Sequence, residues 1–277
     1  MQVDLARARG EDDIHTKRPL GTHEQGFISM SDFDRGLARP GIVAAPDMAV
    51  DAGLRAFMLG VYNKVALGLV VSAILAYVTG KYQPVTDLLF SSDNFGRRGF
   101  TLLGGIIAFA PIGILLFQGF ARRQTAKSAA ITYWVIVSLI GASLGSVFLF
   151  YRMEGIIQTF LVTAAAFGGL SLVGYTTKRD LSGLGSFLIM GLWGLIFASI
   201  ASFFFQSGTL VFIINLVGVG IFAGLVATDT QRMKMTYYQV GGDQEAASVA
   251  TSYGALSLYL DFVNLFRFLL FFMGGRR

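Results

Sequence analysis

Seven long apolar segments, separated by polar stretches, run through the chain after residue 51. Each is close to the ~20 residues that an α-helix needs to cross the ~30 Å hydrocarbon core of a bilayer. All connections except 81–98 and 232–251 are short. Helices joined by a short connection must be antiparallel neighbours. The pattern predicts an all-α membrane protein whose residues 52–277 form seven transmembrane helices, at about 54–79, 99–121, 128–151, 156–177, 183–206, 209–231 and 252–273.

Residues 1–51 have a different character. They are polar and mixed in charge, contain Pro19, Pro40 and Pro46, and lack the apolar core of a signal peptide. Such a composition is typical of disorder. We expect a disordered cytosolic N-terminal tail, which is either passive or docks to a partner protein.

The composition supports a tightly packed membrane bundle. Charged residues make up 14% of the chain, against about 25% in soluble domains, and 54% of the residues are hydrophobic. The 34 glycines favour close approach of transmembrane helices. There is no cysteine, which excludes disulfides, thiolate catalysis and cysteine-based metal sites.

The basic residues predict the orientation of the helices. Outside the apolar segments, Lys and Arg are more than twice as numerous on the side of the tail as on the other side. The positive side of a membrane protein is cytosolic. The N-terminus is therefore expected in the cytosol and, after seven crossings, the C-terminus outside. The net charge of +5 reflects this topology, so it does not indicate nucleic-acid binding.

Two acidic residues fall within the apolar segments, Asp261 in the seventh and Asp229 near the end of the sixth. A charge at bilayer depth costs at least about 2.5 kcal/mol, so an intramembrane aspartate is a candidate functional residue by default. The residues after Asp229 include no Gly or Pro up to about residue 238, so the sixth helix is expected to continue there. The two carboxylates would then lie at equal depth.

The polar residues around this pair form stripes. Ser257, Asp261 and Asn264 are spaced i, i+4, i+7 on the seventh helix, and Asn215 and Asp229 lie close to one face of the sixth. Two polar stripes on consecutive antiparallel helices are expected to face each other inside the bundle. The alternative is a single buried aspartate that is hydrogen-bonded to Asn or Ser for helix packing.

A close carboxylate pair in a medium of low dielectric constant would share one proton. The protonated pair would hold the two helices together as a latch, whereas two ionised carboxylates would repel each other and attract a cation and water. Calcium prefers about six to eight oxygen ligands. Asp229 and Asp261, even with Asn215, Ser257 and Asn264, supply too few for a tight site, so any calcium binding would be weak and transient.

Two basic residues also lie within the segments. Lys64 is deep in the first, where its ammonium either extends to the cytosolic surface or is the counter-ion of a buried carboxylate. Arg267 is nearly two turns beyond Asp261, toward the outer face, where extension to the surface is expected.

An enzyme is not expected. Residues 141–145 match the G-x-S-x-G pattern of serine hydrolases, but the only histidines, His15 and His23, lie in the tail, so no general base is available in the spans. The same residues form a G-x-x-x-G face for close helix packing. We therefore expect no catalytic residues, no resident cofactor and no small-molecule substrate.

Several motifs resemble the transmembrane Bax inhibitor motif family. They are Asp-Thr-Gln at 229–231 and Tyr-Leu-Asp-Phe-Val-Asn-Leu-Phe at 259–266, joined by residues 61–64 and 141–144, which are similar to the bacterial branch. The resemblance covers roughly residues 52–273. It implies seven helices with the last at the centre, surrounded by the other six, and an aspartate latch near the cytosolic side that maps to Asp229 and Asp261.

The resemblance also implies a function. Some members of the family are pH-dependent calcium leak proteins, and some bacterial members bind the membrane-anchored ATP-dependent protease FtsH. A basic residue near the second helix helps to hold the closed state in some members, and Arg122 or Arg123 is the candidate here. We therefore expect a pH-sensitive cation leak protein of the bacterial inner membrane or, alternatively, an interaction protein that modulates such a protease.

Overall fold

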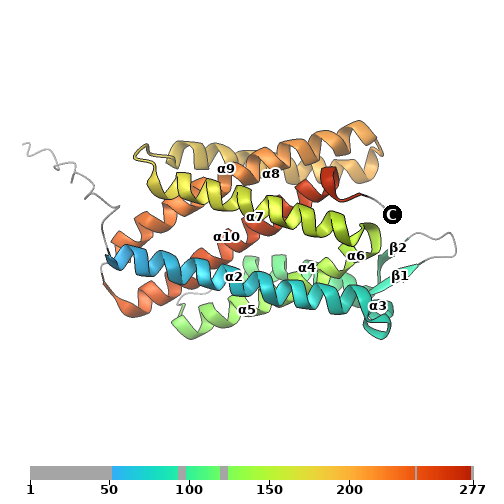
Figure 1. Cartoon of the computed structure of the whole chain (residues 1–277), viewed down its shortest axis with the longest axis horizontal. Helices are drawn as coiled ribbons and strands as arrows, with labels where there is room; N and C mark the ends of the chain where they lie inside the picture. Colours follow the sequence, from blue (N-terminus) through green and yellow to red (C-terminus); the bar gives the residue numbers. More distant parts are fainter. Residues whose placement is uncertain (1–51, 93–97, 119–123, 241, 276–277) are drawn as a thin grey trace, which may run out of the picture. The chain divides into compact units, whose positions relative to one another are not determined.

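A computed structural model describes residues 52–92, 98–118, 124–240 and 242–275 of this chain. The expected tail at 1–51 lies outside the described residues, as do Arg122 and Arg123. The described part is almost entirely helical, with one short two-stranded hairpin (Figure 1).

Six of the described helices are long and apolar enough to cross a membrane. They are α2 (Ala52–Lys81), the broken helix formed by α5 (Ala126–Ser143), η2 (Leu144–Ser146) and α6 (Val147–Phe150), α7 (Met153–Thr176), α8 (Ser182–Phe204), α9 (Gly208–Val240) and α10 (Gln244–Met273). The second expected span is a shorter apolar helix, α4 (Leu102–Gln118), with Pro111 inside it. The prediction of an all-α membrane protein is thus supported, and the described part of the second expected span is an apolar helix of 17 residues.

Helix α10 lies among the other helices. It packs against α9, α2, α7 and α5, whereas the principal neighbour of α4 is α5 and that of α8 is α9. Figure 1 shows α10 crossing between α7 and α2. Half of the residues in the most apolar stretch of α10 are buried inside the protein, the largest share for any of the six helices. Any polar group on this helix is therefore placed where it needs a protein partner.

Helices α9 and α10 both extend beyond their apolar segments. Helix α9 continues past residue 231 to Val240, as expected from the lack of Gly and Pro there. Helix α10 begins at Gln244, well before residue 252, and Asp243 caps it by accepting hydrogen bonds from the backbone N–H groups of Glu245 and Ala246. The expected long loop at 232–251 is therefore wrong, because most of it is helical.

The other expected loop, 81–98, also contains regular structure. Helix α3 (Gln83–Leu89) is followed by strand β1 (Phe90–Ser92), which pairs antiparallel with β2 (Arg98–Phe100). The rings of Phe90 and Phe100 lie 5.4 Å apart across this pair. The hairpin lies at the end of the bundle where α2 ends and α4 begins.

The G-x-S-x-G segment is a packing face. A Cβ atom added to Gly141 would lie 2.6 Å from the Cα atom of Ser72, and one added to Gly145 would lie 2.9 Å from the backbone nitrogen of Gly80. Only glycine allows α2 to approach so closely at these positions. The close-packing role expected for this motif is confirmed.

Candidate functional site

The two intramembrane aspartates lie together in the centre of the bundle. Asp229 comes from α9 and Asp261 from α10, and each residue is only 5% exposed. Their side chains are close enough to be hydrogen-bonded to each other when one carries a proton. The continuation of α9 to Val240 places Asp229 well inside its helix, opposite α10.

Asp229 has two further partners. Its Oδ2 atom accepts a hydrogen bond from the Ser257 hydroxyl, one turn before Asp261 on α10. Its Oδ1 atom is 3.3 Å from Nη1 of Arg232, one turn further along α9. The Arg232 side chain is half exposed, so it can contact water while it balances the charge of a buried carboxylate.

Hydrogen bonding around the pair is incomplete. The Oδ1 atom of Asp229 and the Oδ2 atom of Asp261 are buried and accept no hydrogen bond from the described residues. The contact of Asp229 with Arg232 is an ion pair without hydrogen-bond geometry. A buried acceptor without a donor costs about 1–3 kcal/mol, and a proton shared between the carboxyl groups would supply the missing donor.

The two residues after Asp229 tie α9 to its neighbours. The Thr230 hydroxyl is 3.1 Å from that of Ser171 on α7. Gln231 accepts a hydrogen bond from the backbone N–H of Leu181 and donates one to the carbonyl oxygen of Arg179, both at 2.8 Å. The Asp-Thr-Gln motif thus provides one side chain for the carboxyl pair, one for α7 and one for the α7–α8 connection.

Two lysines near the same region bind neutral partners. The Lys64 ammonium donates a hydrogen bond to the Ser252 hydroxyl at 2.7 Å, so its partner is not a carboxylate. The Lys234 ammonium donates to the carbonyl oxygen of Tyr175, in the last turn of α7. Among the described residues, the counter-ion of the pair is Arg232, in place of the Lys64 that the sequence offered as a candidate.

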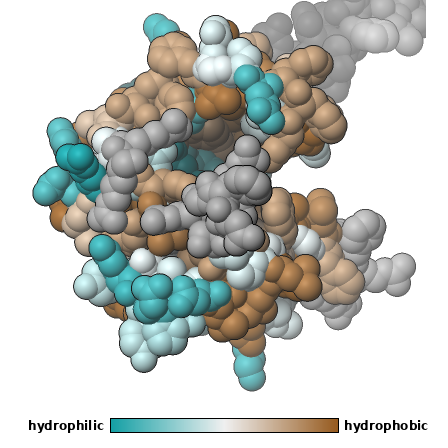
Figure 2. Space-filling model, turned by 90° about the vertical axis from the view of Figure 1, so that its right-hand side faces the viewer, coloured by the Kyte–Doolittle hydropathy of each residue, from teal (hydrophilic) through white to brown (hydrophobic). Residues whose placement is uncertain are grey.

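Asn215 and Asn264 lie in a different place. Both line a cavity of about 530 Å³ that Arg267 also lines and that neither aspartate reaches. Each donates its side-chain amide to a carbonyl oxygen four residues earlier in its own helix, that of Val211 or Leu260. The cavity is at the hairpin end of the bundle, and Figure 2, a view from that end, shows a hollow with hydrophilic residues in its floor.

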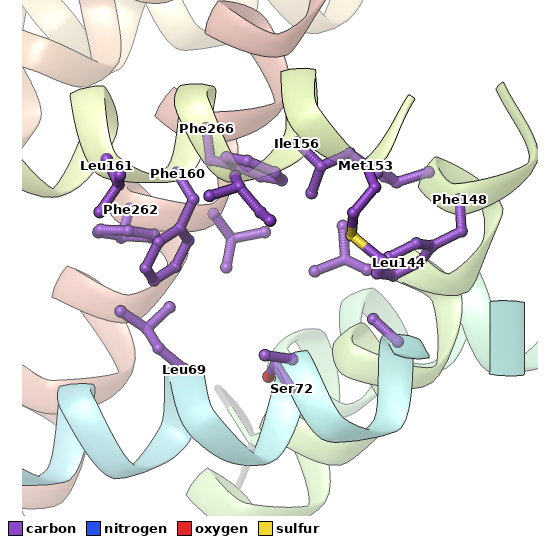
Figure 3. Close-up of a pocket in the computed structure, with 15 residues that line it drawn as sticks. Leu69, Ser72, Leu144, Phe148, Met153, Ile156, Phe160, Leu161, Phe262 and Phe266 are labelled. Carbon is purple, nitrogen blue, oxygen red and sulfur yellow. The ribbon is translucent and has the colours of Figure 1, made fainter. Parts of the chain in front are cut away.

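A second, apolar cavity of about 260 Å³ lies one turn beyond Asp261. Phe262 and Phe266 of α10 and Phe160 of α7 line one side of it, and Leu69 and Ser72 of α2 line the other (Figure 3). The Ser72 hydroxyl is already bonded to the Val137 carbonyl oxygen and the Tyr259 hydroxyl. The side chains that line this cavity are almost all apolar and offer an ion no free ligand.

The described residues include no cluster of three or more His, Cys, Asp or Glu side chains that would hold a metal ion. The site combines two carboxyl groups with an arginine and a serine hydroxyl, groups between which a proton can be exchanged. Such a group of residues is suited to changing its charge in response to pH.

Comparison with known proteins places this bundle in a family. The sequence model of the family described as inhibitor of apoptosis-promoting Bax1 matches residues 54–277. An uncharacterised protein of Caulobacter vibrioides is 59% identical over 249 residues, which is 90% of this chain and 100% of the relative. The inner membrane protein YbhL of Escherichia coli is 39% identical over 229 residues, or 82% of this chain and 94% of the relative. This chain therefore belongs to the Bax inhibitor-1 family.

Proposed function

We propose that this protein is a pH-sensitive cation leak protein, with calcium as the principal cargo, and that Asp229 and Asp261 form its gate. The observation that carries the proposal is the contact between two buried carboxyl groups on α9 and α10, each with an oxygen that no described residue donates to. Family membership supports a channel-like role in a membrane.

The gate works through the charge of the pair. With one shared proton, the carboxyl groups are hydrogen-bonded and hold α9 against α10. Loss of that proton leaves two anions beside the cation Arg232, and the repulsion between them favours separation of the helices. Separated carboxylates supply oxygen ligands for a passing calcium ion, but too few to retain it.

The apolar cavity beyond Asp261 is the second barrier. An ion that leaves the pair toward the outer face meets Phe262, Phe266 and Phe160 and loses its hydration without compensation. Phe262 and Phe266 are on α10, so a displacement of α10 that opens the carboxyl pair also moves these rings. One helix movement therefore opens both barriers.

We further propose the location and orientation of the protein. Because the relative from Escherichia coli is named an inner membrane protein, we assign this chain to the inner membrane of a bacterium. The distribution of Lys and Arg supports an N-terminus in the cytosol and a C-terminus outside.

Calcium flux from proteoliposomes across a pH series around neutrality tests the gate. Flux through the native protein should rise with pH, whereas Asp261→Asn and Asp229→Asn should each flatten the response, because an amide cannot lose the proton. Asp180→Asn is the matched control. The exposed Asp180 accepts a hydrogen bond from Ser182 that lowers the pKa of its carboxyl group, so it stays ionised throughout the series. An unchanged pH response in both gate variants contradicts the proposal.

A second proposal concerns the tail. A leak pathway does not need a tail of 51 residues, and such a segment suits an interaction protein that modulates a membrane-anchored ATP-dependent protease of the FtsH type. Deletion of residues 2–45 followed by co-purification of the protease tests this role. Undiminished binding and unchanged substrate turnover after the deletion would exclude it.

A further inference from the structure

Arg267 has an unusual position on α10. It lies six residues before the end of this helix at Met273, about 9 Å along the axis, in an otherwise apolar stretch. Its side chain is exposed to the cavity of about 530 Å³ at the hairpin end of the bundle. The Arg267 side chain therefore borders a space that is large enough to hold a ligand group.

No carboxylate of the described residues pairs with Arg267; the one ion pair among them joins Arg232 and Asp229. The other polar residues that line its cavity are Ser146, Tyr151, Asn215 and Asn264. An arginine near bilayer depth costs a few kcal/mol unless its charge is balanced or reaches the polar headgroup region. Among the described residues, the cavity thus has a cation and hydrogen-bonding groups but no anion.

The polar groups around Arg267 retain hydrogen-bonding capacity. Asn215 and Asn264 each use an amide N–H for a carbonyl oxygen in their own helix, which leaves a second N–H and the amide oxygen on each side chain. They come from two different helices, α9 and α10, and line the same cavity wall. Together with the planar guanidinium group, they form a set of donors suited to the oxygens of a phosphate.

The rim of the cavity indicates where that phosphate comes from. Phe100, Phe150, Phe268 and Phe271 line the same space, and Phe100 and Phe150 are each 45% exposed. A free inorganic anion gains no stabilisation from contact with aromatic rings. The glycerol and upper acyl chains of a phospholipid, in contrast, pack against such rings. The depth of Arg267 agrees with a lipid phosphate. The side chain of an arginine about 9 Å from a helix end can reach the level of the headgroups.

We propose that this cavity binds the phosphate group of a membrane phospholipid, with Arg267 as the principal ligand and Asn215 and Asn264 as secondary donors. The lipid would balance the charge of Arg267 and fill the space between β2, α6 and the last turns of α10. The site is independent of the carboxyl pair and does not rest on the proposed leak function.

Native mass spectrometry of the full chain in detergent, titrated with phosphatidylglycerol, tests this site. Arg267→Gln should weaken binding of the first lipid about tenfold or more, because a charge-assisted, two-pronged contact is lost. Arg267→Lys keeps the charge but not the planar fork, so an intermediate loss is expected. This milder variant keeps the test decisive if the glutamine variant does not fold.

Two controls separate the outcomes. Arg152→Gln removes an exposed arginine at the same end of the bundle that does not line the cavity, and it should bind the lipid as the native protein does. Diacylglycerol, which has the chains but no phosphate, should bind without dependence on Arg267. Equal phosphatidylglycerol affinity of the native protein and both Arg267 variants overturns the site. Equally tight, Arg267-dependent binding of glycerol 3-phosphate overturns the assignment to a lipid.

Discussion

Gly174 is a position of very close helix packing beside the carboxyl pair. A Cβ atom added there would lie 2.9 Å from the carbonyl carbon of Ala227 and closer still to its oxygen. Ala227 is on α9, two residues before Asp229. Gly174→Ala should therefore push α7 away from α9 and displace the carboxyl pair.

The cost in free energy of unfolding is best measured against a matched variant. Gly169→Ala is on the same helix, and an added Cβ meets nothing within 4 Å. Both substitutions gain about 1 kcal/mol of helix propensity, which cancels in the difference. Overpacking costs about 1–3 kcal/mol, and the obstacle at Gly174 is backbone, which cannot rotate away, so the upper part of that range applies. Gly174→Ala should be about 2–3 kcal/mol less stable than Gly169→Ala.

Unfolding by titration with a denaturing detergent, followed by circular dichroism, measures this difference in the free energy of unfolding. The same proteins in liposomes should show an altered pH response only for Gly174→Ala. Equal stability of the two variants would refute the close approach of α7 and α9 on which the geometry of the site depends.

Two further predictions concern the side chains around the pair. Ser257→Ala removes the hydrogen-bond donor to Asp229. It should lower the free energy of unfolding by about 1.5–3 kcal/mol when that carboxylate is ionised, and by about 0.5–1.5 kcal/mol when it is protonated. A detergent-unfolding titration that finds the same cost at high and low pH would contradict this. Gln231→Ala removes the hydrogen bonds to Leu181 and Arg179, so hydrogen exchange at the Leu181 amide should become faster; an unchanged exchange rate there would show that the contact is not maintained in solution.

Hydropathy predicted where helices cross the membrane but not where they end. The apolar segments coincide with α2, the α5–α6 helix, α7, α8 and the membrane part of α9. The start of α10 was missed because residues 244–251 are mostly polar or small, although they follow an N-capping Asp243. Strands β1 and β2 have three residues each, too few for an alternating pattern to be recognised.

Helical spacing in the sequence predicted part of the site, but not all of it. Helical spacing was sufficient to place Ser257 and Asp261 on one face and to bring them to Asp229. The same spacing rule would have identified Arg232, three residues after Asp229, had the continued helix been used for charges as well as for depth. The cavity around Arg267 depends on how two helices and a hairpin meet, which no local pattern in the sequence encodes.

The central claim is that the two buried carboxyl groups share one proton, and infrared spectroscopy tests it most directly. The native protein in lipid at neutral pH should show the carbonyl stretch of one protonated carboxylic acid per chain, which disappears as the pH rises. The Asp229→Asn, Asp261→Asn double variant should lack this band at every pH above the range in which exposed carboxylates titrate. A native spectrum without the band at neutral pH, or a double variant that retains it, would contradict the account.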